Sequence, residues 1–313
     1  MTSQKINERV LVTGATGMLG TNLVERLNET YEELFVVEHN NKSKYGKGVY
    51  LDLVNIDEVR MQLDQLKPTI IINLAALTDV DACEKNPFQA DVINHKLPKE
   101  LAEYWHRSKL NGLHEVFVVH ISTDYVFDGV VGNYDEESVC NPVNEYGRTK
   151  LLGELAIKSI VSEQNWCLAR MCSIFGLHPK KKTFPVYAIE NLLREQNVIA
   201  AVDQYNSPSY VVNVSDMLEE LIKNKRFGTF HISGSSRLSR YEQAIKIAEE
   251  LGVDTSLIVD KNSAEMNWTA PRPPDSSLAV NKAQTILSNK PLDFDTALRT
   301  FIKEIKKEGY FSL

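Results

Sequence analysis

Short apolar runs alternate with amphipathic stretches along the first half of the chain. The runs lie at residues 9–13, 34–38, 69–73, 116–121 and 166–171. A strand that is apolar along its whole length is buried on both faces, as in a parallel sheet covered by helices. The stretches between the runs have the apolar spacing of helices that bury one side, at 21–30, 55–67, 87–107 and around Tyr146. The pattern therefore predicts an α/β fold with a doubly wound parallel sheet.

The second half of the chain has a less regular pattern. We expect helices at 183–195, 214–224, 239–251 and 294–308, a strand at 198–202, and a proline-rich but structured segment at 268–277. These elements predict a smaller lobe that closes over the end of the sheet. Accordingly, we assign residues 1–172 to a dinucleotide-binding domain. Residues 173–313 are mainly a substrate-binding lobe, with some segments returning to the sheet.

Three glycines follow the first predicted strand directly. Gly14, Gly17 and Gly20 stand in the spacing G-x-x-G-x-x-G, between a strand and a helix. Glycines allow a tight turn and a close approach of the backbone to a pyrophosphate, which then faces the helix N-terminus. The motif predicts a Rossmann-type sheet. We expect the coenzyme to contact this segment through the residues Gly14, Thr16, Gly17, Met18, Leu19 and Gly20.

Other candidate coenzyme contacts lie at the ends of the next strands. Glu38 follows the glycines by about 20 residues, where an acidic side chain binds a ribose diol. His39, Lys42 and Lys44 come next and could hold a 2'-phosphate instead, so NAD and NADP both remain open. Asp52 is either an adenine contact or a cap for the following helix. The remaining candidates are Leu53, Ala75, Ala76 and Leu77.

The candidate chemistry lies in the stretch 119–154. Tyr146 and Lys150 are four residues apart in a predicted helix, so both side chains can face one site. An ammonium near a phenol favours the phenolate, and we therefore expect Lys150 to lower the pKa of Tyr146. Thr123, at a strand end, can bind the same substrate oxygen. The three residues predict catalysis of a carbonyl–alcohol interconversion.

The glycines, the stretch 75–77 and the stretch 122–124 all follow predicted parallel strands. Ligands of such sheets bind outside the carboxyl ends of the strands. We therefore expect these segments to converge on one crevice, with the Tyr146 helix beside it.

Composition excludes several other functions. The net charge is -7 and no apolar run reaches the roughly 18 residues of a membrane span, so we expect neither nucleic-acid nor membrane binding. The four cysteines have no C-x-x-C spacing and the seven histidines form no ligand pattern. We expect a reduced cytoplasmic protein without a metal, and we allow for a homodimer.

Several motifs together resemble one known family. The glycine segment, Asn73 to Ala76, the stretch 78–84, STDYVFDG at 122–129, Tyr146-Gly147-x-x-Lys150, and the pairs around 203–208 and 272–278 occur in the order found in the dTDP-4-dehydrorhamnose reductases. These are extended short-chain dehydrogenases/reductases. The resemblance implies reduction of the 4-keto group of a nucleotide-linked 6-deoxy sugar with NADPH or NADH.

The resemblance also implies roles for individual residues. Tyr146 would be the general acid, Lys150 would hold the nicotinamide ribose, and Thr123 would bind the sugar carbonyl. Gly17, Met18 and Leu19 would contact the pyrophosphate, and Asp52 and Leu53 the adenine, with Ala75, Ala76 and Leu77 along the dinucleotide. Asp124 would contact the substrate. We add Gln204 because it lies in a loop at a strand end, and Tyr125, which is either a sugar-stacking or a core residue.

Three positions depart from the family pattern. Ser173 stands where some members have a tryptophan that touches the sugar, Ile121 replaces an aromatic residue, and Asn206 replaces a common glycine. We place Ser173 among the substrate-binding candidates. These changes leave open a non-catalytic relative like the β subunit of methionine adenosyltransferase. Another reductase or an epimerase of the superfamily is also open. Dehydratases of the superfamily have an acidic residue where this chain has Tyr125, which counts against dehydration.

Overall fold

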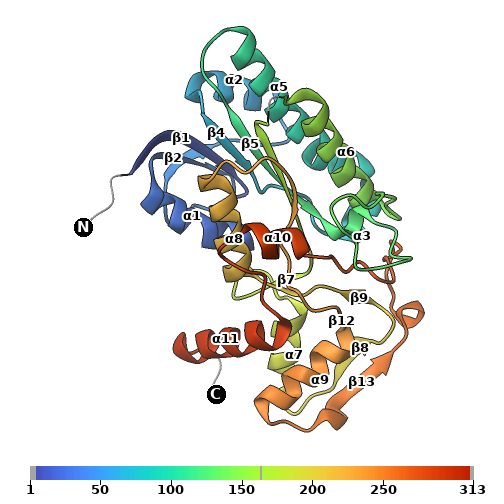
Figure 1. Cartoon of the computed structure of the whole chain (residues 1–313). Coiled ribbons are helices and arrows are strands. Elements are labelled where there is room, and N and C mark those ends of the chain that lie inside the picture. Colours follow the sequence, from blue (N-terminus) through green and yellow to red (C-terminus); the bar gives the residue numbers. More distant parts are fainter. Residues whose placement is uncertain (1–4, 163, 311–313) are drawn as a thin grey trace.

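A computed structural model describes residues 5–162 and 164–310. Its centre is a seven-stranded sheet in the order β11-β6-β5-β4-β1-β2-β3, and every neighbouring pair is parallel (Figure 1). The strands are β1 (Ile6–Thr13), β2 (Tyr31–Glu38), β3 (Lys47–Tyr50), β4 (Ile70–Asn73), β5 (Phe117–Thr123), β6 (Trp166–Met171) and β11 (Gly228–His231). The predicted doubly wound parallel sheet is confirmed.

Alternate residues of each central strand face opposite helical layers. Val10 and Val12 pack with α1 (Met18–Thr30), α8 (Val211–Lys223) and α10 (Asn281–Ile286), whereas Leu11 packs with the other layer. That second layer contains α2 (Ile56–Leu66), α5 (Leu97–Leu110) and α6 (Glu145–Ile160). Both faces of the strands are therefore buried, which explains why their sequences lack polar alternation.

Short helices precede α5 on the second layer. They are α3 (Val80–Lys85), α4 (Pro87–Asp91) and a π-helical turn, η1 (Val92–Lys96), which continues into α5. The single helix that the sequence predicts at 87–107 is thus divided. A π turn places one extra residue in a helical turn, a feature frequent at functional sites, and Ile93 of this turn lines the cleft described below.

The remaining elements form a separate core below the sheet in Figure 1. Helices α7 (Phe184–Leu192), α9 (Arg240–Leu251) and α11 (Phe294–Lys307) enclose it together with the parallel pair β8 (Val198–Ala201) and β13 (Ile258–Lys261). Three short strands, β7 (Ile174–Phe175), β9 (Tyr205–Asn206) and β10 (Ser209–Tyr210), connect this core to the sheet, and β12 (Leu238–Ser239) pairs with β9. Short 3-10 turns lie at η2 (Asp124–Val126), η3 (Thr255–Leu257) and η4 (Ser263–Glu265).

A proline-rich segment at 268–277 crosses from this core to the sheet domain. Asp81 of α3 accepts hydrogen bonds from the backbone N–H groups of Thr269 and Ala270 and pairs with Arg272 at 2.9 Å. Asn144, the N-cap of α6, donates to the Pro271 carbonyl. The segment is therefore fixed by polar contacts at both α3 and α6, as a predicted structured segment should be. Among the described residues, no helix is both long enough and apolar enough to cross a membrane.

Candidate functional site

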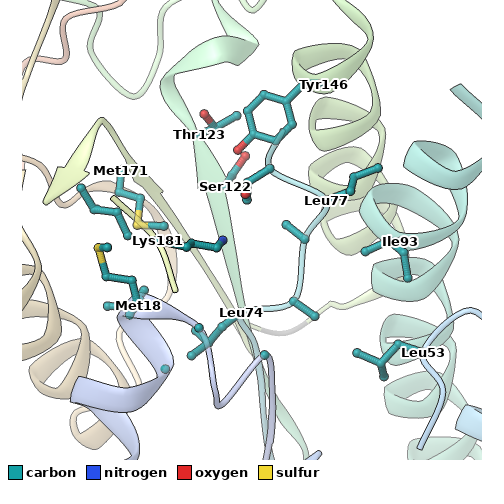
Figure 2. Close-up of a pocket in the computed structure, with 18 of the residues that line it drawn as sticks. Met18, Leu53, Leu74, Leu77, Ile93, Ser122, Thr123, Tyr146, Met171 and Lys181 are labelled. Carbon is teal, nitrogen blue, oxygen red and sulfur yellow. The ribbon is translucent and has the colours of Figure 1, made fainter. Parts of the chain in front are cut away.

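A cleft of about 730 Å³ lies at the carboxyl ends of the central strands. The glycine segment, the residues after β4, the end of β5 and Tyr146 of α6 all border it, as the sequence predicts (Figure 2). On the opposite side the cleft meets the segment before α7. Its lining includes Gly14, Gly17, Met18, Leu19, Gly20, Leu53, Ala75, Ala76, Leu77, Ser122, Thr123, Asp124, Tyr146, Ser173, Lys181 and Thr183.

The glycine segment is a tight turn that brings the N-terminus of α1 to the cleft. Gly14 has φ +68°, and a Cβ there would lie 2.6 Å from the backbone nitrogen of Ala75. A Cβ on Gly20 would lie 2.3 Å from the Gly14 carbonyl oxygen. The N-cap, Gly17, has no side chain to bond the first N–H groups of α1, and the first turn carries no acid. These N–H groups are therefore free to bind an anion.

Tyr146 points into the cleft toward Ser122 and Thr123 at the end of β5 (Figure 2). A hydrogen bond joins the side chains of Tyr146 and Thr123. The Thr123 hydroxyl in turn donates to Asp124 at 3.0 Å. Asn144 caps α6 by accepting from the N–H of Gly147, and so fixes the first turn that carries Tyr146. Thr123 and Tyr146 can therefore bind one substrate oxygen.

Lys150 lies on the same helix face but is deeply buried, at 2% exposure. Its ammonium group donates to the Ile121 carbonyl at 2.5 Å and lies 3.5 Å from Nε2 of His120. Burial lowers the pKa of Lys150 to about 8, against an opposing effect of Glu154. The ammonium is thus beside β5 rather than against the phenol.

The expectation that Lys150 lowers the pKa of Tyr146 is not met in this structure. Burial raises the pKa of the Tyr146 phenol, and the negative charge of Asp124 adds to this, although the hydrogen bond with Thr123 opposes it. Lys150 is absent from these main influences because its nitrogen is directed at the Ile121 carbonyl. The phenol is therefore a protonated hydrogen-bond donor at neutral pH, suited to act as an acid.

Asp124 and Tyr125 continue the strand end in different directions. Asp124 is buried among Thr123, Cys172 and Ser276; burial raises its pKa, and hydrogen bonds from these side chains oppose the rise. The Tyr125 ring packs edge-on against Tyr146, with centroids 5.8 Å apart. It borders a second pocket, so its contacts are neither only core nor only cleft.

This second pocket, of about 580 Å³, lies between the two halves of the chain. Arg240 projects into its wall, donating to Ser173 at 3.2 Å and to Gln243 at 3.3 Å, with its guanidinium over the Phe184 ring. Arg240 has no carboxylate within ion-pair distance in the described ranges. The lining of this second pocket includes Tyr125, Phe184, Tyr187, Gln204, Arg240, Met266, Trp268 and Arg272.

Several predicted contacts lie outside the main cleft. Thr16 is absent from its lining. The Glu38 carboxylate accepts from the N–H of Ser43, in the loop that follows β2, while His39 and Asn40 line the cleft. Asp52 accepts from the N–H of Val54 and Asn55 caps α2, so Asp52 is a turn residue and not the cap.

The departures from the family pattern also lie in different places. Ser173 lines the main cleft and bonds Arg240. Ile121 is buried in the core between β5 and α1, and Asn206 is buried where Gln243 bonds its side chain at 3.1 Å. Of these three positions, only Ser173 borders the main cleft.

Sequence reasoning missed Arg240, Trp268, Lys181 and Thr183. Thr183 is the N-cap of α7, but its buried hydroxyl has no hydrogen-bond partner in the described part of the chain. None of the four lies at a strand end or in a spaced motif. No local pattern in the sequence singles out any of them. No three His, Cys, Asp or Glu side chains gather as a metal site within residues 5–162 and 164–310.

Residues 8–307 match the family model described as the RmlD substrate binding domain. A probable low-salt glycan biosynthesis reductase of Haloferax volcanii is 32% identical over 87% of this chain and 90% of its own. The chain therefore belongs to this family, that of the dTDP-4-dehydrorhamnose reductases, and the resemblance seen in the sequence is confirmed.

Solved structures of this family have the same fold. The dTDP-4-dehydrorhamnose reductase of Bacillus anthracis, solved in complex with NADP, has a TM-score of 0.82 and 30% identity, covering 96% of this chain and all of that one. A hypothetical dTDP-4-dehydrorhamnose reductase from Sulfolobus tokodaii has a TM-score of 0.80 and 35% identity, covering 92% and 98%. A methionine adenosyltransferase 2 β subunit of Xenopus tropicalis is also similar, at 27% identity over 93% of this chain and 86% of its own.

Proposed function

We propose that this protein reduces the 4-keto group of a nucleotide-linked 6-deoxy sugar with NADPH or NADH. The observation that carries the proposal is the pairing of Tyr146 with Thr123 at a cleft bordered by a glycine turn and a free helix N-terminus. A reduced nicotinamide, when bound, supplies the hydride.

The cleft fits a dinucleotide in its chemistry and size. The free N–H groups of α1 suit a pyrophosphate, and the volume lies within the range of ordinary ligand pockets. Small residues after β4, Ala75 and Ala76, allow a flat ring to lie against the backbone. His39, Asn40 and Lys181 line the cleft, whereas the Glu38 carboxylate accepts from the Ser43 N–H. This arrangement favours a 2'-phosphate over a free ribose diol.

The second pocket supports a nucleotide sugar as the substrate. Within residues 5–162 and 164–310, no carboxylate pairs with the Arg240 guanidinium, which donates to Ser173 and Gln243. Guanidinium groups bind phosphate oxygens through two parallel hydrogen bonds. Trp268 and Tyr187 provide apolar surface for a base or sugar ring. Tyr125 and Ser173 lie between this pocket and Tyr146. A sugar held by Arg240 would reach the Thr123 and Tyr146 hydroxyls.

In the proposed reaction the chain's own groups act on the carbonyl oxygen. Thr123 and Tyr146 bind this oxygen by hydrogen bonds that strengthen as negative charge develops. Tyr146 then gives its proton to the oxygen. Burial keeps the phenol protonated until that charge appears.

The test is an assay of purified protein with NADPH and NADH against a panel of 4-keto-6-deoxy sugar nucleotides. We expect turnover, and we expect Tyr146→Phe to lower kcat by about 10²–10⁴-fold with unchanged coenzyme affinity, because general acid catalysis is worth that much. Tyr134→Phe, which removes a hydroxyl from a tyrosine outside the cleft, is the matched control. No turnover with any sugar, together with capture of a partner enzyme, would instead indicate a regulatory subunit.

A further inference from the structure

A chain of four buried polar side chains runs across the sheet from the glycine turn to Lys150. The Thr13 hydroxyl donates to Asn73 Oδ1 at 2.5 Å, and Asn73 Nδ2 lies 3.0 Å from His120 Nδ1. Nε2 of the same imidazole lies 3.5 Å from Lys150 Nζ. All four residues are at most 2% exposed. Such a chain cannot exchange its hydrogen bonds with water, so each member fixes the next.

The direction of the hydrogen bonds in this chain follows from its first member. The backbone N–H of Ala75 donates to the Thr13 oxygen at 3.3 Å. If the Asn73 amide were turned round, Thr13 would receive two donors, and its own hydrogen would have no acceptor in the described part of the structure. Asn73 therefore accepts from Thr13 through Oδ1 and donates through Nδ2 to His120.

This order determines the tautomer of His120. Because Nδ1 accepts from Asn73, the ring proton of the neutral imidazole is on Nε2, the atom that faces Lys150. The ring is completely buried, and burial together with the charge of Lys150 holds the pKa of His120 well below its usual range. An N–H thus points at the lysine nitrogen.

The packing of α6 brings this N–H close to the lysine. Gly153 lies one turn from Lys150, and a Cβ there would be 3.4 Å from His120 Nε2 and 2.4 Å from the Asn94 carbonyl oxygen. A larger residue would separate α6 from both β5 and η1. The glycine therefore sets the distance between Lys150 and the imidazole.

We propose that His120 is a positioning residue for Lys150. When the lysine is an uncharged amine, His120 donates its Nε2–H to the lysine nitrogen. When the lysine is an ammonium, the same Nε2–H turns the ammonium's own N–H groups toward the Ile121 carbonyl and the cleft. The uncharged amine has the lone pair that accepts this N–H, so His120 favours the lysine that has released a proton. The kinetic part of this inference rests on the function proposed above, but the tautomer does not.

Few other charged groups act on Lys150. Glu154 lies one turn along α6 and opposes the effect of burial on the lysine, but Arg170 of β6 binds its carboxylate at 2.9 and 2.8 Å and Lys158 lies 3.8 Å from it. Tyr146 is protonated, and η1 contributes the amide of Asn94, which bonds Thr149. His120 is therefore the polar side chain nearest to Lys150 whose replacement leaves the surrounding charges unchanged.

The first test reads the tautomer directly in the protein without substrate or coenzyme. The measurement is the ¹⁵N NMR spectrum of protein labelled with ¹⁵N-histidine, in which the His120 signals are identified by their loss in His120→Phe. These signals should show Nδ1 unprotonated and Nε2 protonated, with no titration between about pH 5 and 9. Protonation at Nδ1, or a charged ring in this range, would overturn the proposal. An inactive preparation leaves this test standing, so its failure is separate from failure of the proposed reaction.

The second test is the pH dependence of kcat in His120→Phe, which keeps the ring but removes both nitrogens. We expect the alkaline fall of kcat to move upward by about 0.5–1 pH unit, because the uncharged amine loses its donor. His231→Phe is the control, since His231 is also fully buried and bonds Ala279 outside the cleft. An alkaline fall of kcat at the same pH as in the native chain, or at a lower pH, would overturn the proposal. If His120→Phe does not fold, the tautomer test decides, with the His120 ring signals assigned instead by correlation to the backbone ¹⁵N and ¹³C signals of His120.

Discussion

At the scale of the residue, the main feature of this site is a lysine buried where its charge is costly. Lys150 has one short hydrogen bond, to the Ile121 carbonyl, and no carboxylate of the described residues lies within ion-pair distance of it. A cation in such surroundings is retained at the expense of stability. Functional groups often lower stability in this way. Lys150 therefore offers a test that separates function from fold.

Replacing Lys150 by methionine should stabilise the protein at pH 7 while abolishing turnover. The pKa of Lys150 in the folded chain is about 8, against about 10.4 when unfolded, so the unfolded state binds more protons between these values. The buried charge therefore destabilises the folded state fully below pH 8, and this destabilisation disappears as the pH rises. We expect a gain of about 1–3 kcal/mol in the free energy of unfolding at pH 7.

Denaturant unfolding at pH 7 and pH 9.5 measures this effect. The advantage of Lys150→Met should shrink at the higher pH, where the native lysine has become neutral. Lys158→Met is the matched control because Lys158 is on the same helix but is partly exposed beside Glu154. A loss of stability in Lys150→Met at pH 7 would show that the charge is compensated.

At the scale of the element, the sequence predicted those parts whose patterns are local. The apolar runs gave β1, β2, β4, β5 and β6, and the glycine spacing gave the turn before α1. Because parallel strands end at one edge of a sheet, the strand ends also indicated the cleft. In contrast, the sequence did not predict β11 and β13. Each has only four residues and depends on pairing with a strand distant in the chain.

Side-chain direction was the part of the site that local patterns could not provide. The i, i+4 spacing correctly put Tyr146 and Lys150 on one helix, but the carbonyl of Ile121 lies across on β5 and attracts the lysine. Arg240 reaches Ser173 from a helix 67 residues away in the chain. Both contacts arise from tertiary packing, which no spacing rule contains.

The ion pair between Arg170 and Glu154 joins β6 to α6 beneath the cleft. Arg170 is 2% exposed and donates to both oxygens of the completely buried Glu154 carboxylate. Burial favours the protonated acid, but Arg170 outweighs this and holds the pKa of Glu154 below its usual value. Breaking such a pair leaves one charge uncompensated.

Glu154→Gln should therefore lower the free energy of unfolding by about 3–5 kcal/mol at pH 7. Since the folded pKa lies below the unfolded one, this contribution is present above about pH 4.5 and is lost as pH falls through the folded value. Urea titrations of Glu154→Leu, Arg170→Met and the double variant complete the test. The double variant should lose less than the two single variants together, and simple additivity would contradict an energetic pair.

At the scale of the whole molecule, the sheet and the C-terminal core are joined across the second pocket. The segment at 268–277 forms one wall of that pocket, through Trp268 and Arg272, and it is fixed to the sheet domain mainly by Asp81. The Arg272 guanidinium also lies over the Trp268 ring, 5.4 Å from its centroid. One carboxylate thus orders the wall that the proposed substrate would contact.

Asp81→Ala should release this wall and weaken the substrate without affecting the coenzyme. The hydrogen bonds that Asp81 accepts from the backbone N–H groups of Ala270 and Thr269, together with the Arg272 ion pair, hold the pKa of Asp81 below its usual range, although burial opposes this. The carboxylate is therefore ionised and bound at neutral pH. We expect the KM for the sugar nucleotide to rise about tenfold, because charged hydrogen bonds of this kind are worth about 1.5–3 kcal/mol each and part of that orders the wall.

The cleft proposed to hold the coenzyme is lined neither by Asp81 nor by the 268–277 segment, so the coenzyme Kd should stay the same. Asp79→Ala is the control, since Asp79 caps α3 by accepting from the N–H of Ala82 but does not bond the 268–277 segment. Asp79→Ala should cost about 1 kcal/mol of stability with little change in KM.

Limited proteolysis should cut Asp81→Ala between residues 262 and 274 faster than either the native chain or Asp79→Ala. Equal cutting rates with an unchanged KM would mean that the wall is held by the prolines and by Asn144 alone.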